Sequence, residues 1–345
     1  MCAARRVTLR TIAESVGLSV NTVSRALAGK DAVNEQTREL VRAEADRLGY
    51  VPNSMARSLV LGAAMTFGMV ITHPANPFYS MLISGVEERC RANGYSLLLM
   101  VTEESLDIER SAAEALQRWG VDGAIVIPVQ ESAEHWQRLQ DSGVPIVLVN
   151  RDLTEMECDF AGVDYEAGAY RAASHLLDSG ARTIHLLEED LPLTSVGDRI
   201  TGFRRALDER GVTLADDTIR RVPSQNPGAS TLPWELADAY HLAQELVPEL
   251  APGAAVMTGN DYFALGLYRA LAESDLRVPD DVAILGFGDH PFSAYLNPTL
   301  SSVRLPAAEI GTAAVDMLLH RLKEMSSDVE TLRLQPELVV RASTR

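Results

Sequence analysis

Cysteine is scarce in this chain of 345 residues, which contains only Cys2, Cys90 and Cys158. Three distant thiols make neither a disulfide framework nor a metal-binding knuckle, and they are typical of a reducing cytoplasm. No apolar run reaches the roughly 18 residues of a membrane span, and the N-terminus lacks the apolar core of a signal peptide. We therefore expect a cytoplasmic protein that has no membrane partner.

Sequence motifs of catalysis and of metal binding are also missing. Gly286 and Gly288 follow an expected strand, but Pro291 stands where a dinucleotide-binding fingerprint needs its third glycine. The chain has no phosphate-binding loop that ends in Gly-Lys-Ser/Thr and no serine in a nucleophile elbow. Its seven histidines lack the spacing of metal ligands. The sequence thus predicts no enzyme, no cofactor and no metal site.

Charge is distributed unevenly along the chain. The formal net charge is −17, yet residues 1–62 contain nine basic and six acidic residues, so that this segment is positive. A basic head on an acidic body suggests that the head is the part that approaches a polyanion. The alternative is a solvated surface on which the gradient of charge is accidental.

Three short amphipathic helices are predicted in the head. Apolar residues recur at helical spacing after Thr8, which is a plausible N-cap, and Gly17 ends this first helix. Ser19 can cap a second helix, and a third runs from about Asn34 to Gly49. Two helices joined by a tight turn and followed by a third predict a helix-turn-helix unit.

The second helix presents polar residues opposite its apolar face. Asn21 and Arg25 are four residues apart and share one face, whereas Val23 and Leu27 lie on the other. An asparagine can form two hydrogen bonds with an adenine edge, and an arginine can do the same with guanine. A recognition helix places such residues in the major groove. A small three-helix core with a polar outer face is the structural alternative.

The head resembles that of the LacI/GalR family of bacterial transcription repressors. The matching segments are TLRTIAE (8–14) and SVNTVSRAL (19–27), and then LGYVPN (48–53) and ARSL (56–59), which resemble the hinge helix of the family. The order and spacing of these motifs are specific, and the resemblance extends over almost the whole chain. It implies a sequence-specific DNA-binding repressor that binds palindromic double-stranded operator DNA as a homodimer.

The resemblance also implies roles for individual residues in DNA binding. Val20, Asn21 and Arg25 fall where family members read bases, and Leu59 falls where the hinge leucine wedges between base pairs from the minor groove. Packing under the core is the alternative for Leu59. The residues expected at phosphates are Ser19, Thr22, Ser24, Asn34 and Thr37. Further expected DNA contacts within the matching motifs are Thr8, Asn53, Ala56 and Arg57.

The rest of the chain alternates apolar strands with amphipathic helices. Continuous Leu/Ile/Val runs between helices indicate parallel strands that are buried on both faces, and two series of them give two α/β lobes. The predicted fold is a small all-α helix-turn-helix head joined to an α/β core of two doubly wound parallel-sheet lobes. The resemblance implies that this core is of the periplasmic-binding-protein-like type I. The expected strands are 66–71, 95–101, 123–127, 144–149, 183–187, 254–257, 282–285 and 335–340.

The predicted domain division has a head, a hinge and a core. The head is 1–51, the hinge helix with its linker is 52–62, and the core is 63–345. The resemblance implies crossings between the lobes near Gly162, Arg304 and Leu332. The N-lobe then comprises about 63–162 and 305–332, and the C-lobe about 163–304 and 333–345. Ligands of such folds bind at the carboxyl ends of the strands, here between the lobes.

The resemblance places several candidate effector contacts in this cleft. Arg199 matches an arginine that holds ligand hydroxyls, for which five fixed donors are suited. Trp234 lies where some sugar-binding members stack an indole on the sugar ring. A surface ion pair is the alternative for Arg199, and a core anchor is the alternative for Trp234. The expected effector-binding residues are Phe78, Tyr79, Asn150, Arg199, Trp234, Asn260 and Asp289.

One position departs from the pattern of the family. Gly288 stands where the family usually has an aspartate that accepts hydrogen bonds from the ligand. Asp289 or His290 can replace that carboxylate only in part. The effector that we expect is a sugar or glycoside, and a different small molecule or no ligand is the alternative. Only 341–345 follow the last expected strand, without a leucine heptad tail, so a dimer is expected rather than a tetramer.

Overall fold

The structure is a computed structural model of the chain. It describes residues 7–27, 33–50, 63–212, 215, 218–223, 236–324 and 328–344. The chain divides into two units, Met1–Ala64 and Met65–Arg345, and each unit has its own hydrophobic core. Within the described ranges, no helix is both long enough and apolar enough to cross a bilayer.

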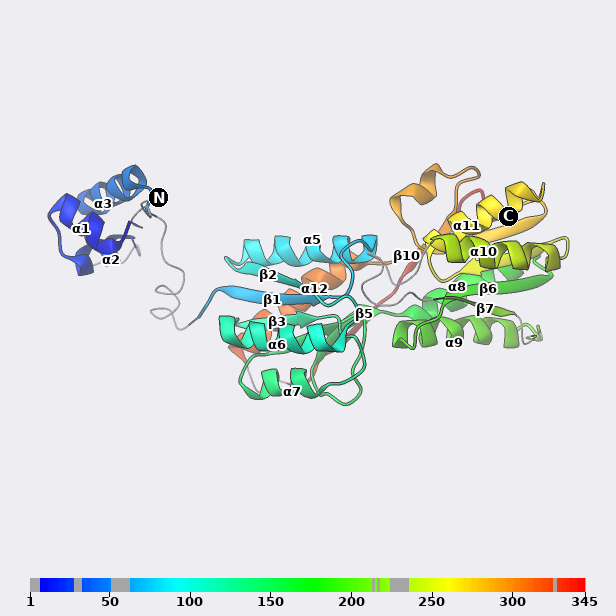
Figure 1. The fold of residues 1–345 in the computed structure, drawn as a ribbon, viewed down its shortest axis with the longest axis horizontal. Coiled ribbons are helices and arrows are strands. Elements are labelled where there is room, and N and C mark those ends of the chain that lie inside the picture. Colours follow the sequence, from blue (N-terminus) through cyan, green and yellow to red (C-terminus); the bar gives the residue numbers. More distant parts are fainter. Residues whose placement is uncertain are drawn as a thin grey trace. The chain divides into compact units, whose positions relative to one another are not determined.

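The first unit is a bundle of three helices, α1 (Leu9–Val16), α2 (Val20–Leu27) and α3 (Glu35–Leu48) (Figure 1). Gly17 ends α1 in the left-handed conformation, with φ of 69°, which a glycine adopts without steric cost. The tight turn that results brings α2 across α1, as expected of a helix-turn-helix. The bundle is held together by a core of buried apolar residues, namely Ile12, Ala13, Val23, Ala26, Val33, Val41 and Ala45.

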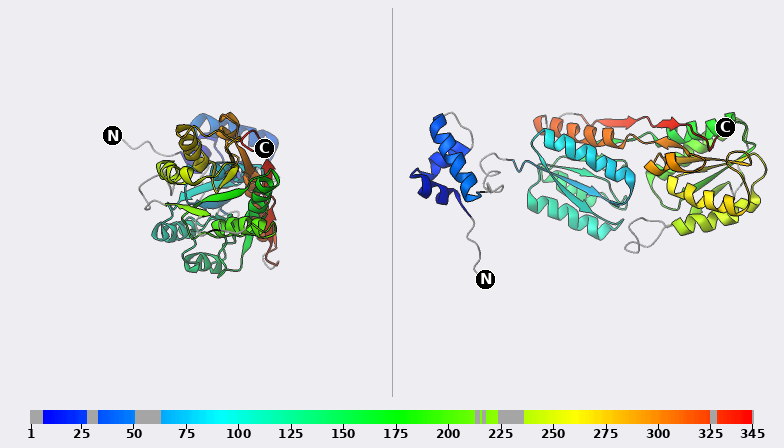
Figure 2. Two further views of the ribbon diagram at one scale, coloured as in Figure 1. Left: turned by 90° about the vertical axis from the view of Figure 1, so that its right-hand side faces the viewer. Right: turned by 90° about the horizontal axis from the view of Figure 1, so that it is seen from above.

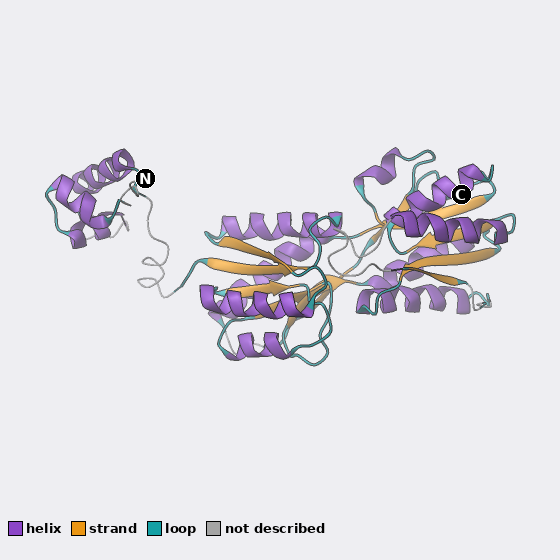
Figure 3. Ribbon diagram, viewed as in Figure 1, coloured by secondary structure: helices purple, strands orange, loops and turns teal. Residues whose placement is uncertain are grey.

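The second unit is the core, and its first sheet belongs to the N-lobe. Across this parallel sheet the strands are β11 (Thr331–Leu334), β5 (Asp159–Val163), β4 (Ile146–Val149), β3 (Gly123–Val126), β1 (Thr66–Ile71) and β2 (Ser96–Val101). The covering helices are α5 (Pro77–Ala92), α6 (Leu106–Trp119), α7 (Glu134–Asp141) and α12 (Ala307–Lys323). Helices α5 and α12 cover one face and α6 and α7 the other, so that every residue of β3 and β4 is buried (Figure 3).

The second sheet belongs to the C-lobe and has the same construction. Across it the strands are β12 (Glu337–Val339), β10 (Ser301–Arg304), β9 (Val282–Gly288), β8 (Ala254–Thr258), β6 (Thr183–Glu189) and β7 (Ile219–Val222). Its helices are α8 (Tyr165–Asp178), α9 (Thr194–Asp208), α10 (Leu236–Leu246) and α11 (Asp261–Glu273), with short 3₁₀ turns η1 (Val247–Glu249) and η2 (Pro291–Tyr295). Among the described strands, only β12 runs antiparallel to its neighbour.

The chain passes between the two lobes three times. It leaves the first sheet after β5, returns to the N-lobe after β10, and passes again from β11 to β12. Figure 2 shows β11 and β12 running one after the other from one lobe to the other. Each of these crossings leaves its sheet at the carboxyl end of a strand, namely β5, β10 or β11. The carboxyl ends of the two sheets therefore face each other across the junction. The predicted fold class, a helical head with two parallel α/β lobes, is therefore confirmed.

Candidate functional site

Helix α2 buries one face and offers the other to solvent. Val23 and Ala26 are fully buried, whereas Val20 is 45% exposed and Asn21 and Arg25 are also exposed. The side chains of Asn21 and Arg25 make no hydrogen bond and no ion pair within the described part of the chain. Their polar groups are therefore available for the edges of bases, which is the role that the sequence predicts for them.

The side chains predicted to contact phosphates mostly cap the helices of the head. Thr8 accepts a hydrogen bond from the backbone N–H of Thr11 at the start of α1. The Ser19 hydroxyl accepts from the N–H of Thr22, and its oxygen lies 2.8 Å from the Thr22 hydroxyl oxygen. Asn34 accepts from the N–H of Thr37 at 2.8 Å. These caps define where each helix begins. Phosphate binding by Ser19, Thr22, Ser24, Asn34 and Thr37 stays a prediction, as does the DNA contact of Thr8.

Five of the predicted site residues lie outside the described residues. They are Asn53, Ala56, Arg57 and Leu59 of the expected hinge, and Trp234 of the expected effector site.

A cleft lies at the carboxyl ends of the strands in the core. It contains about 620 Å³ of space, including the part that is open to solvent, and it is lined by residues of both lobes. The structure brings five predicted effector residues together in its lining, namely Phe78, Tyr79, Asn150, Arg199 and Asn260.

Arg199 is the most constrained polar residue of this cleft. Its Nε and Nη2 donate to the two carboxylate oxygens of Glu188 at 2.9 and 2.7 Å, and Glu188 is fully buried. The guanidinium carbon also lies 5.4 Å from the ring centre of Tyr165 and 5.5 Å from that of Phe287. Burial opposes the charge, but Glu188 and Glu189 more than offset this effect and raise the pKa of Arg199. Arg199 is therefore a charged, fixed donor at the wall of the cleft.

A second buried ion pair faces Arg199 from the N-lobe. Arg151 donates from Nη1 and Nη2 to the two carboxylate oxygens of Glu104, both at 2.7 Å. Burial works to raise the pKa of Glu104, but the charge and hydrogen bonds of Arg151 outweigh it and leave this pKa below its ordinary value. The Nε2 atom of His73 lies 3.8 Å from Glu104, and burial lowers the pKa of this histidine, which favours its neutral form.

Asparagine amides supply neutral polar groups at the same place. The Tyr165 hydroxyl donates to Oδ1 of Asn150 at 2.6 Å, and the N–H of Tyr262 donates to Oδ1 of Asn260 at 3.0 Å. The amide nitrogens of Asn150 and Asn260 make no hydrogen bond within the described ranges. Each asparagine therefore has its oxygen fixed by the protein and its two N–H donors available for a ligand.

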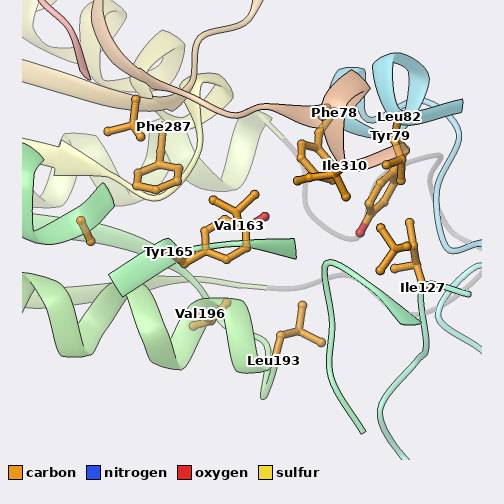
Figure 4. Close-up of a cluster of buried hydrophobic side chains, with 14 of the residues drawn as sticks. Phe78, Tyr79, Leu82, Ile127, Val163, Tyr165, Leu193, Val196, Phe287 and Ile310 are labelled. Carbon is orange, nitrogen blue, oxygen red and sulfur yellow. The ribbon is translucent and has the colours of Figure 1, made fainter. Parts of the chain in front are cut away.

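Aromatic and aliphatic side chains line the remaining wall. The Tyr165 and Phe287 rings are stacked with their centres 5.9 Å apart, and Phe78 and Tyr79 pack edge to face at 5.6 Å. Figure 4 shows the first pair near Val163, the last residue of β5, and the second pair near Ile310 of α12. Flat apolar surfaces of this kind suit the apolar face of a sugar ring.

The structure does not place Asp289 at the cleft. Its carboxylate binds Arg304 at 2.8 Å and Arg341 at 2.7 Å, and it is absent from the lining. The chain turns at this residue, where φ is 48°, so that the side chain is aimed along β10 instead of into the cleft. The expectation that Asp289 contacts the effector is therefore not supported by its position.

His290 occupies the space beside Gly288 instead. A Cβ added to Gly288, where φ is 128°, would lie 2.9 Å from Cε1 of the His290 ring. His290 lines the cleft, and burial lowers its pKa in spite of the nearby Asp261 carboxylate. The departure at Gly288 thus makes room for an imidazole of the protein itself, so it does not leave an empty space for a larger ligand.

One pair of hydrogen bonds joins the lobes at the edge of the cleft. The side chain of Gln130 donates to the Thr194 hydroxyl at 3.0 Å and accepts from the Thr194 N–H at 3.2 Å. Gln130 follows β3 in the N-lobe, and Thr194 begins α9 in the C-lobe. This contact must break if the lobes open.

Several cleft residues were not singled out from the sequence. Arg151 lies two residues after β4, Glu188 and Glu189 end β6, and Tyr165 begins α8. Polar residues at the carboxyl ends of strands are the signal that would have found the first three. In the described ranges no group of three His, Cys, Asp or Glu side chains is arranged to hold a metal ion.

Comparisons with known proteins agree with both halves of this architecture. Residues 8–53 match the model of the bacterial regulatory proteins of the lacI family, and residues 173–344 match that of a periplasmic binding protein-like domain. The chain is 31% identical over 339 residues to the ribose operon repressor of Escherichia coli (strain K12). That alignment covers 97% of this chain and 99% of the repressor.

Solved structures give the same result. The crystal structure of a LacI family transcriptional regulator from Enterococcus faecium with bound ribose is 28% identical, with a TM-score of 0.70, and covers 81% of this chain and 98% of that one. A lac repressor dimer bound to operator and the anti-inducer ONPF shares the fold, with 24% identity, a TM-score of 0.86, and coverage of 98% and 99%. The chain therefore belongs to the lacI family of bacterial regulatory proteins, and it is a DNA-binding transcriptional regulator controlled by a small-molecule effector in its core.

Proposed function

We propose that this regulator is a repressor whose effector is a hydroxylated small molecule, a sugar or a glycoside, bound between the two lobes. The observation that carries this proposal is the cleft in which a fixed guanidinium, two amide groups and stacked aromatic rings converge. Guanidinium and amide donors suit the oxygens of a polyol, and the rings suit its apolar faces. The likeness to a ribose operon repressor and to a ribose-bound regulator supports the same class.

The two lobes provide the means by which the effector acts. Asn150 and Arg151 belong to the N-lobe, whereas Arg199 and Asn260 belong to the C-lobe, so a ligand that contacts all four bridges the lobes. Such a ligand favours the arrangement in which both sets of contacts are made. If operator DNA favours one arrangement as well, the effector and the operator change each other's affinity by the same factor.

The operator contacts come from α2. Val20, Asn21 and Arg25 are exposed along one face of this helix, as a major-groove reader requires. Selection of binding sites from random duplex DNA with the full chain tests this role. We expect enrichment of a two-fold symmetric sequence, and binding that enriches no sequence would contradict it.

Homodimer formation is supported by an apolar sheet edge. Strand β2 is the last strand of its sheet, and Leu99 on it is 41% exposed. Met81 on α5 and Ile108 on α6 add exposed apolar surface on the two helices that pack beside β2. An apolar edge strand with unpaired backbone groups is suited to association with a second copy. Leu99→Asp should shift the sedimentation equilibrium from dimer to monomer, and an unchanged dimer would show that this edge is not the interface.

The effector class is tested by thermal unfolding of the full chain in the presence of single compounds. Ribose, glucose and cellobiose represent sugars and a glycoside, and adenine and leucine represent other small molecules. A ligand that binds only the folded protein raises Tm. We expect a rise with at least one of the sugars, whereas a rise only with the other compounds would contradict the proposal.

A further inference from the structure

The cleft has more carboxylates than guanidinium groups, although two buried arginines belong to it. Arg151 and Arg199 supply two positive charges, and Glu104, Glu188 and Glu189 supply three negative ones. Glu104 and Glu189 are part of the lining, and Glu188 lies behind Arg199. The fixed charges at the site therefore carry a negative balance although its most prominent donors are guanidinium groups.

Each guanidinium already holds a carboxylate of the protein through one of its two-donor forks. Each one already donates two hydrogen bonds to a buried carboxylate, Arg151 to Glu104 and Arg199 to Glu188, at 2.7 to 2.9 Å. Nη2 of Arg199 also lies 3.6 Å from Glu189. A phosphate or carboxylate that bound either fork in the same way would have to displace its partner and leave that carboxylate buried without a counterion, which is costly. A hydroxyl needs only one of the remaining N–H donors.

At three helix N-termini near the cleft, a side chain already accepts from one backbone N–H group. Helix N-termini commonly bind anions through free backbone N–H groups. Asn76 caps α5 and Asn260 caps α11 with their side-chain oxygens. The first N–H of α9, that of Thr194, is bonded to the side chain of Gln130. The side chain of Ser195, in the same turn, is a neutral hydroxyl that contributes to the lining.

The two histidines of the cleft do not restore positive charge. Burial lowers the pKa of both His73 and His290, which favours the neutral imidazole at neutral pH. Glu104 faces His73, and Asp261 and Asp289 are the charged groups near His290. Neutral imidazoles can exchange hydrogen bonds with hydroxyls, as the asparagine amides can.

We propose that the cleft selects uncharged or cationic hydroxylated ligands and rejects their phosphorylated or carboxylated forms. The proposal rests on the proposed function, because it specifies the charge of the hydroxylated effector. It follows from the geometry of the ion pairs: each guanidinium charge is balanced by a carboxylate of the protein, and Glu189 adds a further carboxylate to the lining.

Matched pairs of ligands test this selection on the wild-type protein. The pairs are ribose with ribose 5-phosphate, glucose with glucose 6-phosphate, and glucose with gluconate, and glucosamine serves as the cationic probe. Binding to the full chain is measured by calorimetry and by the rise in Tm. For each neutral sugar that binds, we expect its anionic partner to bind at least about tenfold more weakly. Glucosamine should bind no more weakly than glucose.

The outcomes separate this proposal from the one on which it rests. If an anionic member binds as tightly as its neutral partner or more tightly, the charge selection is overturned, while a hydroxylated effector remains supported. If no member of any pair binds and cellobiose does not bind either, the proposed function is overturned, and the charge selection falls with it.

A charge-neutralising variant identifies the group that rejects anions. Glu189→Gln keeps the size of the side chain and should reduce the preference for the neutral member by about threefold or more. Glu134→Gln is the matched control, because Glu134 is 65% exposed and paired with Arg138 on α7. A preference that is unchanged in Glu189→Gln, or equally reduced in the control, would overturn the role of Glu189.

Discussion

Replacement of Arg199 by alanine should destabilise the folded core even in the absence of a ligand. The change removes the two hydrogen bonds to Glu188 and leaves a carboxylate that is fully buried without a counterion. Loss of one partner of a buried ion pair typically costs about 3–5 kcal/mol. At about 2–4 °C per kcal/mol for a domain of this size, Tm should fall by roughly 6–20 °C. Weak effector binding by this variant would therefore not by itself identify Arg199 as a ligand contact.

A double variant separates stability from recognition. Glu188→Gln together with Arg199→Met removes both charges at once and should recover most of the lost free energy of unfolding. It cannot supply a guanidinium donor to a sugar hydroxyl, so effector affinity should stay reduced by about 1.5–3 kcal/mol, or more than tenfold. Glu134→Gln with Arg138→Met is the control, because that pair is exposed on α7.

Urea unfolding and calorimetry of the three variants decide between the two roles. An Arg199→Ala protein with wild-type stability would refute the buried pair with Glu188. A double variant that binds sugars as the wild type does would refute the role of Arg199 in recognition and leave it a purely structural residue.

The remaining predictions concern the head, the departure at Gly288 and the thiols. Arg25→Ala should weaken binding to the selected operator by about 1–3 kcal/mol and relax the sequence preference at one base pair per half-site. Equal losses of affinity for operator and for random DNA would indicate a phosphate contact. Gly288→Ala should lower the free energy of unfolding by about 1–3 kcal/mol, because of backbone strain and the close contact with His290. Removal of the imidazole in the double variant Gly288→Ala/His290→Ala should recover part of this loss. Wild-type stability of the single variant would contradict the prediction. Burial raises the pKa of Cys90 to about 11 and that of Cys158 to about 12, so a maleimide at pH 8 should label these two thiols of a Cys2→Ser variant only after unfolding. Rapid labelling of the folded variant would contradict their burial.

Strands buried on both faces were predictable from the sequence. The run 66–71 coincides with β1, and 254–257 and 282–285 fall within β8 and β9. Continuous apolar residues leave little alternative there, because both faces of these strands are covered by helices. The three helices of the head were equally clear, since each combines an apolar stripe with a polar cap or a glycine stop.

Short strands with polar residues were not recognised. Strand β10 contains Ser301 and Ser302, which are fully buried, and their hydroxyls bond to Thr344 and Asp261 respectively. A buried serine whose hydroxyl is satisfied by a distant residue gives no apolar signal. The same limit applies to β5, β7 and β11, which are only four or five residues long.

Site residues were predictable where a polar residue follows the carboxyl end of a buried strand. Asn150 and Asn260 each follow a buried strand, and both line the cleft as expected. The partner of Arg199 was not predictable, because it requires knowing that the end of β6 lies against α9. The expected effector contact of Asp289 is not supported for a similar reason. Asp289 itself has a left-handed backbone conformation, which directs its side chain towards Arg304 and Arg341.

The most direct test of the account measures operator affinity with the cleft empty and with the cleft occupied. A fluorescent operator obtained by selection is titrated with the full chain, without sugar and with a saturating concentration of a sugar that raises Tm. The account predicts that operator affinity changes by about fivefold or more, as expected for allosteric coupling of about 1–3 kcal/mol. Unchanged operator affinity at a sugar concentration that saturates the cleft would contradict it.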